Sequence, residues 1–221
     1  AGDFDPDKVI ATIDRYFGSW KKSDHVAYPQ FPVQKTLTSP VSTTVMGNEA
    51  ENIMMAWKMD GAAALQNDTL NVISELLSNG KAGLFDIDLN QPMRCQVAQA
   101  FNYDMRDYSQ FIAYGMPNEG QSLDDVKNLI LAEIEKLKRG EFSDKLIPAI
   151  VNNMKLSYLN LLDNNQSRAD AFVNSFINGR DWQTEVEKYD RIAKMTKQQI
   201  VDFARRHFTD GYAIVYKKKG E

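Results

Sequence analysis

Few side chains in this sequence could bind a metal ion, because it contains only two histidines and one cysteine. A zinc site takes three or four ligands from histidine, cysteine and carboxylate side chains. Neither His25 nor His207 has another histidine or a cysteine at ligand spacing. We therefore predict that the chain itself carries no metal or other cofactor. Cys95 cannot form an internal disulfide and is predicted to be a buried thiol.

One acidic run has the spacing of the first half of a calcium-binding loop. Asp86, Asp88 and Asn90 fit that spacing, but Gln91 replaces the required glycine and Val97 replaces the required glutamate. The sequence also lacks a G-x-S-x-G nucleophile elbow, a Walker-type loop and a G-x-G-x-x-G motif. The residues alone therefore indicate no active site.

The composition is that of an ordinary globular protein. Of 221 residues, 43% are apolar and 25% are charged. No apolar run approaches the ~20 residues of a transmembrane helix. The net charge of −4 argues against general nucleic-acid binding, and the basic clusters at 21–22 and 217–219 are typical of solvated surface. We expect a soluble protein with one main domain, no nucleic-acid partner and no membrane span.

The best-defined unit of the sequence is a predicted β-β-α segment between positions 93 and 140. Residues 93–103 alternate as in a half-buried strand, and residues 108–114 form a second strand. A helix with an apolar stripe follows, capped by Ser122 with Asp125 three residues on and ended by Gly140. Of the two sides of residues 93–103, we expect helices to cover the one that carries Val97, Phe101 and Tyr103. That side carries Met93, Cys95, Val97, Phe101 and Tyr103, and the opposite side carries Arg94, Gln96, Ala98, Ala100 and Asn102.

The remaining pattern completes an α+β fold. Residues 19–40 contain three prolines and no periodicity, so they are predicted to be a linker. The state of residues 83–90 stays open between a short helix and a loop. Further strands are predicted at 41–47, 52–59 and 212–216, with helices at 5–18, 62–78, 143–162, 167–178, 182–193 and 196–208. Asp5 is predicted to cap the first of these helices, with Pro6 just inside its start. This order favours an antiparallel sheet covered by helices on one face.

Several local strings, taken in order, resemble the M16 metallopeptidases, the family of pitrilysin, insulinase and the mitochondrial processing peptidase. The resemblance extends over essentially the whole chain. It is carried by Gly2–Pro6 and the following helix that ends at Arg15–Gly18, by a strand through Trp57, and by Asn79–Gly80, Gly83–Phe85 and Lys138–Ser143. It implies the LuxS/MPP-like fold of the family's second domain.

The resemblance also implies a domain organisation. Residues 1–24 would be the C-terminal helix of a truncated, catalytic-type domain, residues 25–40 the linker, and residues 41–221 the second, non-catalytic domain. The family's inverted zinc motif, H-x-x-E-H, has no match here, so this chain alone is predicted to be inactive. Zinc is expected in the parent's upstream domain. The expected partners are that domain, the other half of the protein or a partner subunit, and a peptide substrate.

In this family, the side of the sheet away from the helices lines a chamber that encloses the peptide. With the sides assigned as above, this side would carry Arg94, Gln96 and Asn102, our candidate chamber residues. Some partner domains of the family use an arginine and a later tyrosine to hold the peptide, but residues 89–97 contain no tyrosine. Three functions stay open: part of a zinc peptidase, an inactive M16-like scaffold or assembly subunit, and an unrelated α+β binding module.

Overall fold

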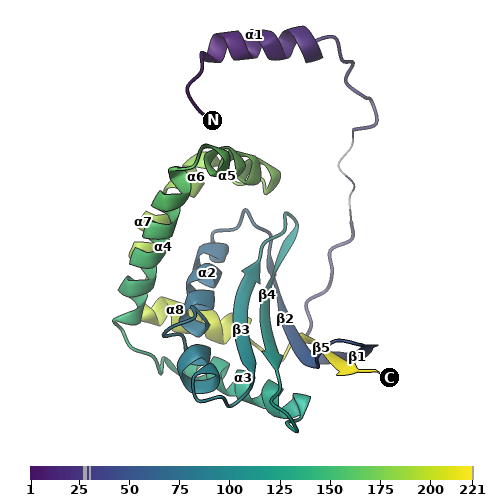
Figure 1. Cartoon of the computed structure of the whole chain (residues 1–221), viewed down its shortest axis with the longest axis vertical. Helices are drawn as coiled ribbons and strands as arrows, with labels where there is room; N and C mark the ends of the chain where they lie inside the picture. Colours follow the sequence, from purple (N-terminus) through teal and green to yellow (C-terminus); the bar gives the residue numbers. More distant parts are fainter. Residues whose placement is uncertain (27–28, 30, 221) are drawn as a thin grey trace.

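The computed structural model describes residues 1–26, 29 and 31–220, and its main body is a five-stranded sheet with helices on one face (Figure 1). The strand order is β1-β5-β2-β4-β3. The strands are β1 (Val41–Gly47), β2 (Asn52–Asp60), β3 (Val97–Tyr103), β4 (Tyr108–Met116) and β5 (Ala213–Lys219). All neighbouring strands run antiparallel except β1 and β5, which run parallel. The predicted α+β class is confirmed, and the sheet is mixed rather than purely antiparallel.

The helices fall close to the predicted positions. The segment 83–90, left open by the sequence, contains a short π-helix, and Pro148 lies in the first turn of its helix, where a missing N–H is tolerated. The helices are α1 (Pro6–Phe17), α2 (Gln66–Leu77), η1 (Asp86–Asn90), α3 (Leu123–Arg139), α4 (Leu146–Leu162), α5 (Asn165–Ile177), α6 (Trp182–Val186), α7 (Lys188–Ala193) and α8 (Lys197–His207).

Alternate residues of β2 form the centre of the core. Ile53, Met55, Trp57 and Met59 are buried against the helices. The Trp57 ring packs edge-on against Phe208 with 5.4 Å between ring centres, and its indole N–H donates to the Thr209 carbonyl at 2.9 Å. A buried tryptophan therefore keeps a hydrogen-bond partner while its ring fills the core.

The predicted caps of α3 are confirmed. Ser122 and Asp125 form a reciprocal capping box, and Gly140 ends the helix in the left-handed conformation with φ of 73°. The helix lies very close to β4 at Gly115, where an added β-carbon would lie 2.5 Å from Val126 Cγ1. Glycine at this position lets the apolar stripe of α3 reach the sheet.

Helices α4 to α7 form a curved helical arm (residues 146–193) that lies beside α2 and reaches past the end of the sheet (Figure 1). Asp68 of α2 holds this arm against the core by ion pairs with two arginines of the arm. Its carboxylate accepts from Arg180 Nη2 at 2.6 Å and from Arg191 Nη2 at 2.8 Å, and its side chain is only 2% exposed. The arm is thus joined to the core by a buried ionic contact as well as by packing.

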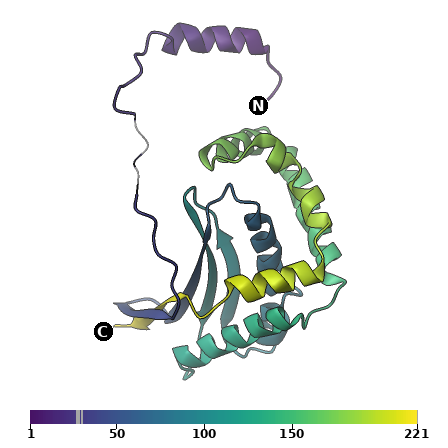
Figure 2. The same cartoon turned by 180° about the vertical axis from the view of Figure 1, so that it is seen from behind.

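Helix α1 lies apart from the sheet (Figure 2). The Asp5 side chain accepts hydrogen bonds from the Asp7 and Lys8 N–H groups and caps the helix, as the sequence predicts. None of the α1 residues is buried. Over residues 19–40, the described positions form neither helix nor strand.

The prediction for the start of β3 and for its covered side was wrong. The strand begins at Val97, because the Asn90 side chain bonds the Ala98 N–H (2.7 Å) and carbonyl (2.9 Å) and the chain before it turns through Met93, whose φ is +53°. Helix α2 packs against β3 over Ala98 and Ala100, which are buried. The side carrying Phe101 is therefore the uncovered one.

Candidate functional site

The candidate site is the face of the sheet opposite the helices, which we call the open face. We define it by the nine residues of β2, β3 and β4 on that side of the sheet that pair in three complete cross-strand rows. They are Met54, Ala56 and Lys58 of β2, Gln99, Phe101 and Tyr103 of β3, and Gln110, Ile112 and Tyr114 of β4.

Strand register sorts these nine residues into three cross-strand rows. One row is Gln99–Tyr114–Met54, the next is Phe101–Ile112–Ala56, and the third is Tyr103–Gln110–Lys58. Paired residues lie on the same side of a sheet, with their Cβ atoms about 5 Å apart. The open face is therefore a continuous surface of aromatic, aliphatic and amide side chains.

Exposure differs along the open face. Tyr103, Met54 and Phe101 are 55%, 40% and 38% exposed, whereas Ile112, between Phe101 and Ala56 in its row, is 7% exposed. Large apolar side chains on a solvent-facing strand surface leave apolar area that a ligand can bury. Chemically, the surface can bind and orient a chain, and none of its nine residues is a histidine, cysteine, serine or threonine.

The linker borders one end of the open face. Lys58 Nζ donates to the Gln34 carbonyl, which fixes the linker beside the third row. Between them lies a groove of about 730 Å³ with an apolar wall from the linker. It is lined by Pro29, Phe31, Pro32, Val33, Gln34, Lys58, Met105, Asp107 and Tyr108. Residues 31–34 of this chain thus lie at the edge of the face.

The structure does not place the three predicted chamber residues together. Arg94 and Gln96 precede β3 and are exposed, whereas Asn102 lies in the strand and points to the helix-covered side. Arg94 lines a shallow groove of about 510 Å³ along α3, and its carbonyl accepts from Gln121 Nε2 at 2.9 Å. Their contact with a substrate stays a prediction.

Asn102 belongs to a polar cluster beneath the β3–β4 turn. Its amide Nδ2 donates to Asn67 Oδ1 at 3.2 Å and to Asp104 Oδ1 at 2.5 Å. Burial raises the pKa of Asp104, opposed by the positive charge of Lys188 and by the hydrogen bond from Asn102. These contacts assign Asn102 to holding the turn rather than to the open face.

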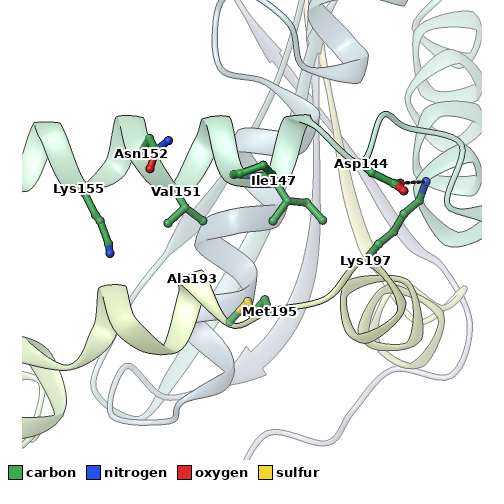
Figure 3. Close-up of a pocket in the computed structure, with 9 residues that line it drawn as sticks. Asp144, Ile147, Val151, Asn152, Lys155, Ala193, Met195 and Lys197 are labelled. Carbon is green, nitrogen blue, oxygen red and sulfur yellow. Dashed lines mark hydrogen bonds and ion pairs between the residues drawn. The ribbon is translucent and has the colours of Figure 1, made fainter.

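A second cleft, of about 380 Å³, lies on the helix side between α4, α8 and the segment that joins α7 to α8 (Figure 3). At one end, Lys197 Nζ pairs with Asp144 Oδ1 at 2.8 Å, and Ile147, Val151 and Met195 form its apolar wall. The two charged groups at that end satisfy each other, and the lining contains no histidine, cysteine or serine. This cleft is separate from the open face.

His207 and Cys95, whose side chains are of the kinds most able to bind metal, each lie in packed surroundings. His207 stacks on Phe203 with ring centres 4.1 Å apart, and burial lowers its pKa. Cys95 is buried, as predicted, and burial raises the pKa of its thiol. Within the described part of the chain, no three His, Cys, Asp or Glu side chains gather where they could share a metal ion. These residues do not fit a zinc site.

Sequence reasoning missed most of the open face, notably Tyr103, Gln110 and Tyr114. The available signal was the pair of small residues Ala98 and Ala100, which permit close approach of a helix and so mark the covered side. Among residues 1–26, 29 and 31–220, no helix has the length and apolar character needed to cross a membrane.

Comparison with known proteins gives a consistent result. The curated zinc protease PqqE of Helicobacter pylori is 23% identical over 214 residues, which is 95% of this chain and 48% of that protein. A crystal structure of a protease from H. pylori matches with a TM-score of 0.90 at 22% identity, covering 98% of this chain and 54% of that one. The chain thus spans about half the length of these relatives.

A crystal structure of the peptidase M16 inactive domain from Pseudomonas fluorescens also matches, with a TM-score of 0.80 at 12% identity over 100% of this chain and 53% of that one. Such likenesses at low identity establish the fold. The family described as the peptidase M16 inactive domain matches residues 1–154 directly. Since this match covers more than half of the 221 residues, the chain belongs to the M16 peptidase family as a non-catalytic, inactive domain.

Proposed function

We propose that this domain forms one wall of a peptide-enclosing chamber in a zinc peptidase, in which a preceding domain of the parent protein holds the zinc. The observation that carries the proposal is the open face. A sheet whose second side is free of helices presents Phe101, Tyr103, Tyr114 and their neighbours as one broad surface. Such a surface binds a chain without cutting it.

The residue types on the open face suit an extended peptide. Aromatic rings and Met54 offer apolar contact to side chains, and Gln99 and Gln110 can donate to and accept from a peptide backbone. A bound extended chain exposes alternate side chains at a spacing of roughly 6.5–7 Å, comparable with the spacing of same-face residues along each strand. The wall therefore supplies many moderate contacts in place of one deep pocket.

Arg94 and Gln96 are proposed as rim contacts rather than as part of the wall. Both are exposed immediately before β3, where a peptide leaving the face at this end would pass. The Arg94 guanidinium can pair with a peptide carboxylate. In place of Asn102, which points to the helices, we propose its neighbours Phe101 and Tyr103 as substrate contacts.

The test uses the parent protein and compares peptide cleavage by two variants. The double variant Phe101→Ala/Tyr103→Ala should raise KM roughly tenfold, because two exposed aromatic contacts of about 0.5–1 kcal/mol each are lost, with little change in kcat. Met46→Ala is the matched control, since Met46 is 64% exposed on β1 and lies outside the open face. An equal urea midpoint for all proteins shows that folding is intact.

Unchanged KM values for several peptides in the double variant would contradict the chamber role. A parent without H-x-x-E-H upstream, or one that cleaves no peptide while binding partner subunits stably, would instead identify the scaffold function. These outcomes are separable, because the first concerns binding by this domain and the second concerns catalysis by another.

A further inference from the structure

A small cavity lies between the helical arm and the turn that joins β3 to β4. Its volume is about 250 Å³, and every helix of the arm contributes to its lining, as does Asp104 of the turn. None of the nine residues of the open face lines it. Pockets for drug-sized molecules usually have roughly 300–1,000 Å³, so this cavity has room for a smaller ligand.

Charged groups of both signs line the cavity. They are Asp104, Arg180, Glu185 and Lys188. The Arg180 guanidinium is held in place, because Nη2 donates to Asp68 Oδ1 at 2.6 Å and Nε lies 3.4 Å from Glu185 Oε2. Burial raises the pKa of Asp104, and the positive charges of Lys188 and Arg180 oppose this shift. Groups of opposite charge thus lie around one small space.

Lys188 has unused hydrogen-bonding capacity. The residue is half-buried on α7, and its amine forms no hydrogen bond or ion pair with any residue that the structure describes. An ammonium group carries three donors, and its strongest hydrogen bonds are those to a carboxylate or phosphate. Lys188 therefore marks the position at which an acidic group of a ligand can bind.

Two tyrosines line the cavity beside the charged groups. Tyr158 of α4 and Tyr189 of α7 lie with ring centres 4.8 Å apart and ring planes tilted by 35°. Burial and the negative charge of Glu185 raise the pKa of Tyr189 to about 12, so its hydroxyl stays protonated at neutral pH. An aromatic or aliphatic side chain can bury its apolar area against the two rings.

We propose that this cavity binds a free α-amino acid with an apolar side chain. The ligand carboxylate pairs with Lys188, and the ligand ammonium group pairs with Asp104. The apolar side chain packs against Tyr158 and Tyr189. A zwitterion suits the lining, because its two carboxylates and two cations have no net charge, whereas a purely anionic ligand would meet Asp104 and Glu185.

A bound amino acid would also join the arm to the sheet. It would contact the arm through α4 and α7, and the sheet through the β3–β4 turn. A ligand that binds only the closed arrangement favours that arrangement, so amides of α7 should exchange more slowly when the site is filled. The binding does not require the chamber function proposed above, and either proposal can fail alone.

Calorimetric titration of the chain 1–221 with L-phenylalanine tests the site. Two analogues are compared with it: phenylalaninamide lacks the carboxylate, and hydrocinnamate keeps the carboxylate and ring but lacks the ammonium group. L-Phenylalanine should bind at least about tenfold more tightly than either analogue, because each analogue leaves one charged group of the cavity without its partner.

Variants of the chain locate the binding. Lys188→Met should weaken L-phenylalanine binding by about tenfold or more, since it removes a charge-assisted hydrogen bond. Lys194→Met is the matched control, because Lys194 caps the end of the same helix, is exposed and does not line the cavity. Asp104→Asn keeps the shape of its side chain and tests the ammonium end independently. Equal urea midpoints show that folding is intact.

Three outcomes would overturn the proposal. One is the absence of binding heat and of any change in α7 exchange at about 10 mM L-phenylalanine. Another is binding of hydrocinnamate as tightly as L-phenylalanine, which would assign the cavity to a plain carboxylate. The third is equal affinity of Lys188→Met and Lys194→Met, which would place the bound amino acid elsewhere on the molecule.

Discussion

At the scale of single residues, Glu133 is a buried carboxyl group with only one of its two oxygens bonded among the described residues. Its side chain is 2% exposed, Oε1 accepts from Lys136 Nζ at 2.9 Å, and Oε2 has no hydrogen-bond partner among the described residues. Burial raises its pKa above the ordinary 4.5, while Lys136 opposes this shift and Asp88 adds to it. Lys136 also bonds Asp88 and lowers the pKa of that carboxyl group.

The raised pKa of Glu133 predicts a dependence of stability on pH. A carboxyl group whose pKa is higher in the folded state stabilises the fold at low pH, and this contribution is lost as pH rises through the folded value. The variant Glu133→Gln lacks this titration. Near neutral pH its free energy of unfolding should exceed that of the wild type by up to about 1 kcal/mol, and this difference should disappear toward pH 5.

Urea unfolding at several values between about pH 5 and pH 8 measures this difference. Glu135→Gln serves as the control, because Glu135 has the same chemistry and its side chain is 52% exposed. Parallel stability curves for wild type and Glu133→Gln over this range would show that the buried carboxyl group does not titrate there.

At the scale of elements, the helical arm depends on the contact between Asp68 and its two arginines. Replacing Asp68 with asparagine leaves Arg180 and Arg191 without their shared counter-charge, and Arg180 is itself 8% exposed. Breaking a buried ion pair by removing one partner costs about 3–5 kcal/mol. We expect Asp68→Asn to lower the free energy of unfolding by this amount and to speed exchange of the α6 and α7 amides.

The comparison variant is Asp190→Asn. Asp190 lies on the arm as well, but its side chain is 78% exposed and its distance to Lys155 Nζ is 3.8 Å. An exposed pair of this kind contributes less than about 1 kcal/mol, so this variant should behave as wild type. Similar exchange in the two variants would mean that packing alone holds the arm.

The sequence was sufficient to predict elements whose signals are local. The capping box at Ser122, the proline and Asp5 cap of α1, and the stop at Gly140 each depend on residues within one turn, and all are confirmed. The side of β3 that faces the helices was predicted wrongly because it depends on a distant partner. Helix α2 needs small residues beneath it, so Ala98 is covered while the larger Phe101 is not.

The candidate site was accessible from the sequence only in outline for the same reason. An uncovered sheet face follows from the order of elements, but its residues follow from register and from the choice of side. The pairing of Ile112 with Ala56 joins positions that are 56 residues apart in sequence, and the pairing of Phe101 with Ile112 joins two separate strands. No periodicity within one strand carries that information.

At the scale of the whole molecule, the chain divides into a packed body and a separate first helix. The α3 residues Val126, Ile130 and Leu137 are fully buried, whereas no residue of α1 is buried. In the chain 1–221 alone, amides of α1 should therefore exchange with solvent orders of magnitude faster than those of α3. Exchange at comparable rates in both helices at low protein concentration would contradict this division.

The place of β5 in the sheet has a consequence for how the chain folds. This strand, residues 213–219, lies between β1 and β2, which come some 160 residues earlier. Contacts between such distant segments form late, because a long loop must close before they contribute. During synthesis on the ribosome, β1 has no strand to pair with until residues 213–219 have emerged. Its edge is then open to pairing with other nascent chains, which makes a chaperone most useful at that stage.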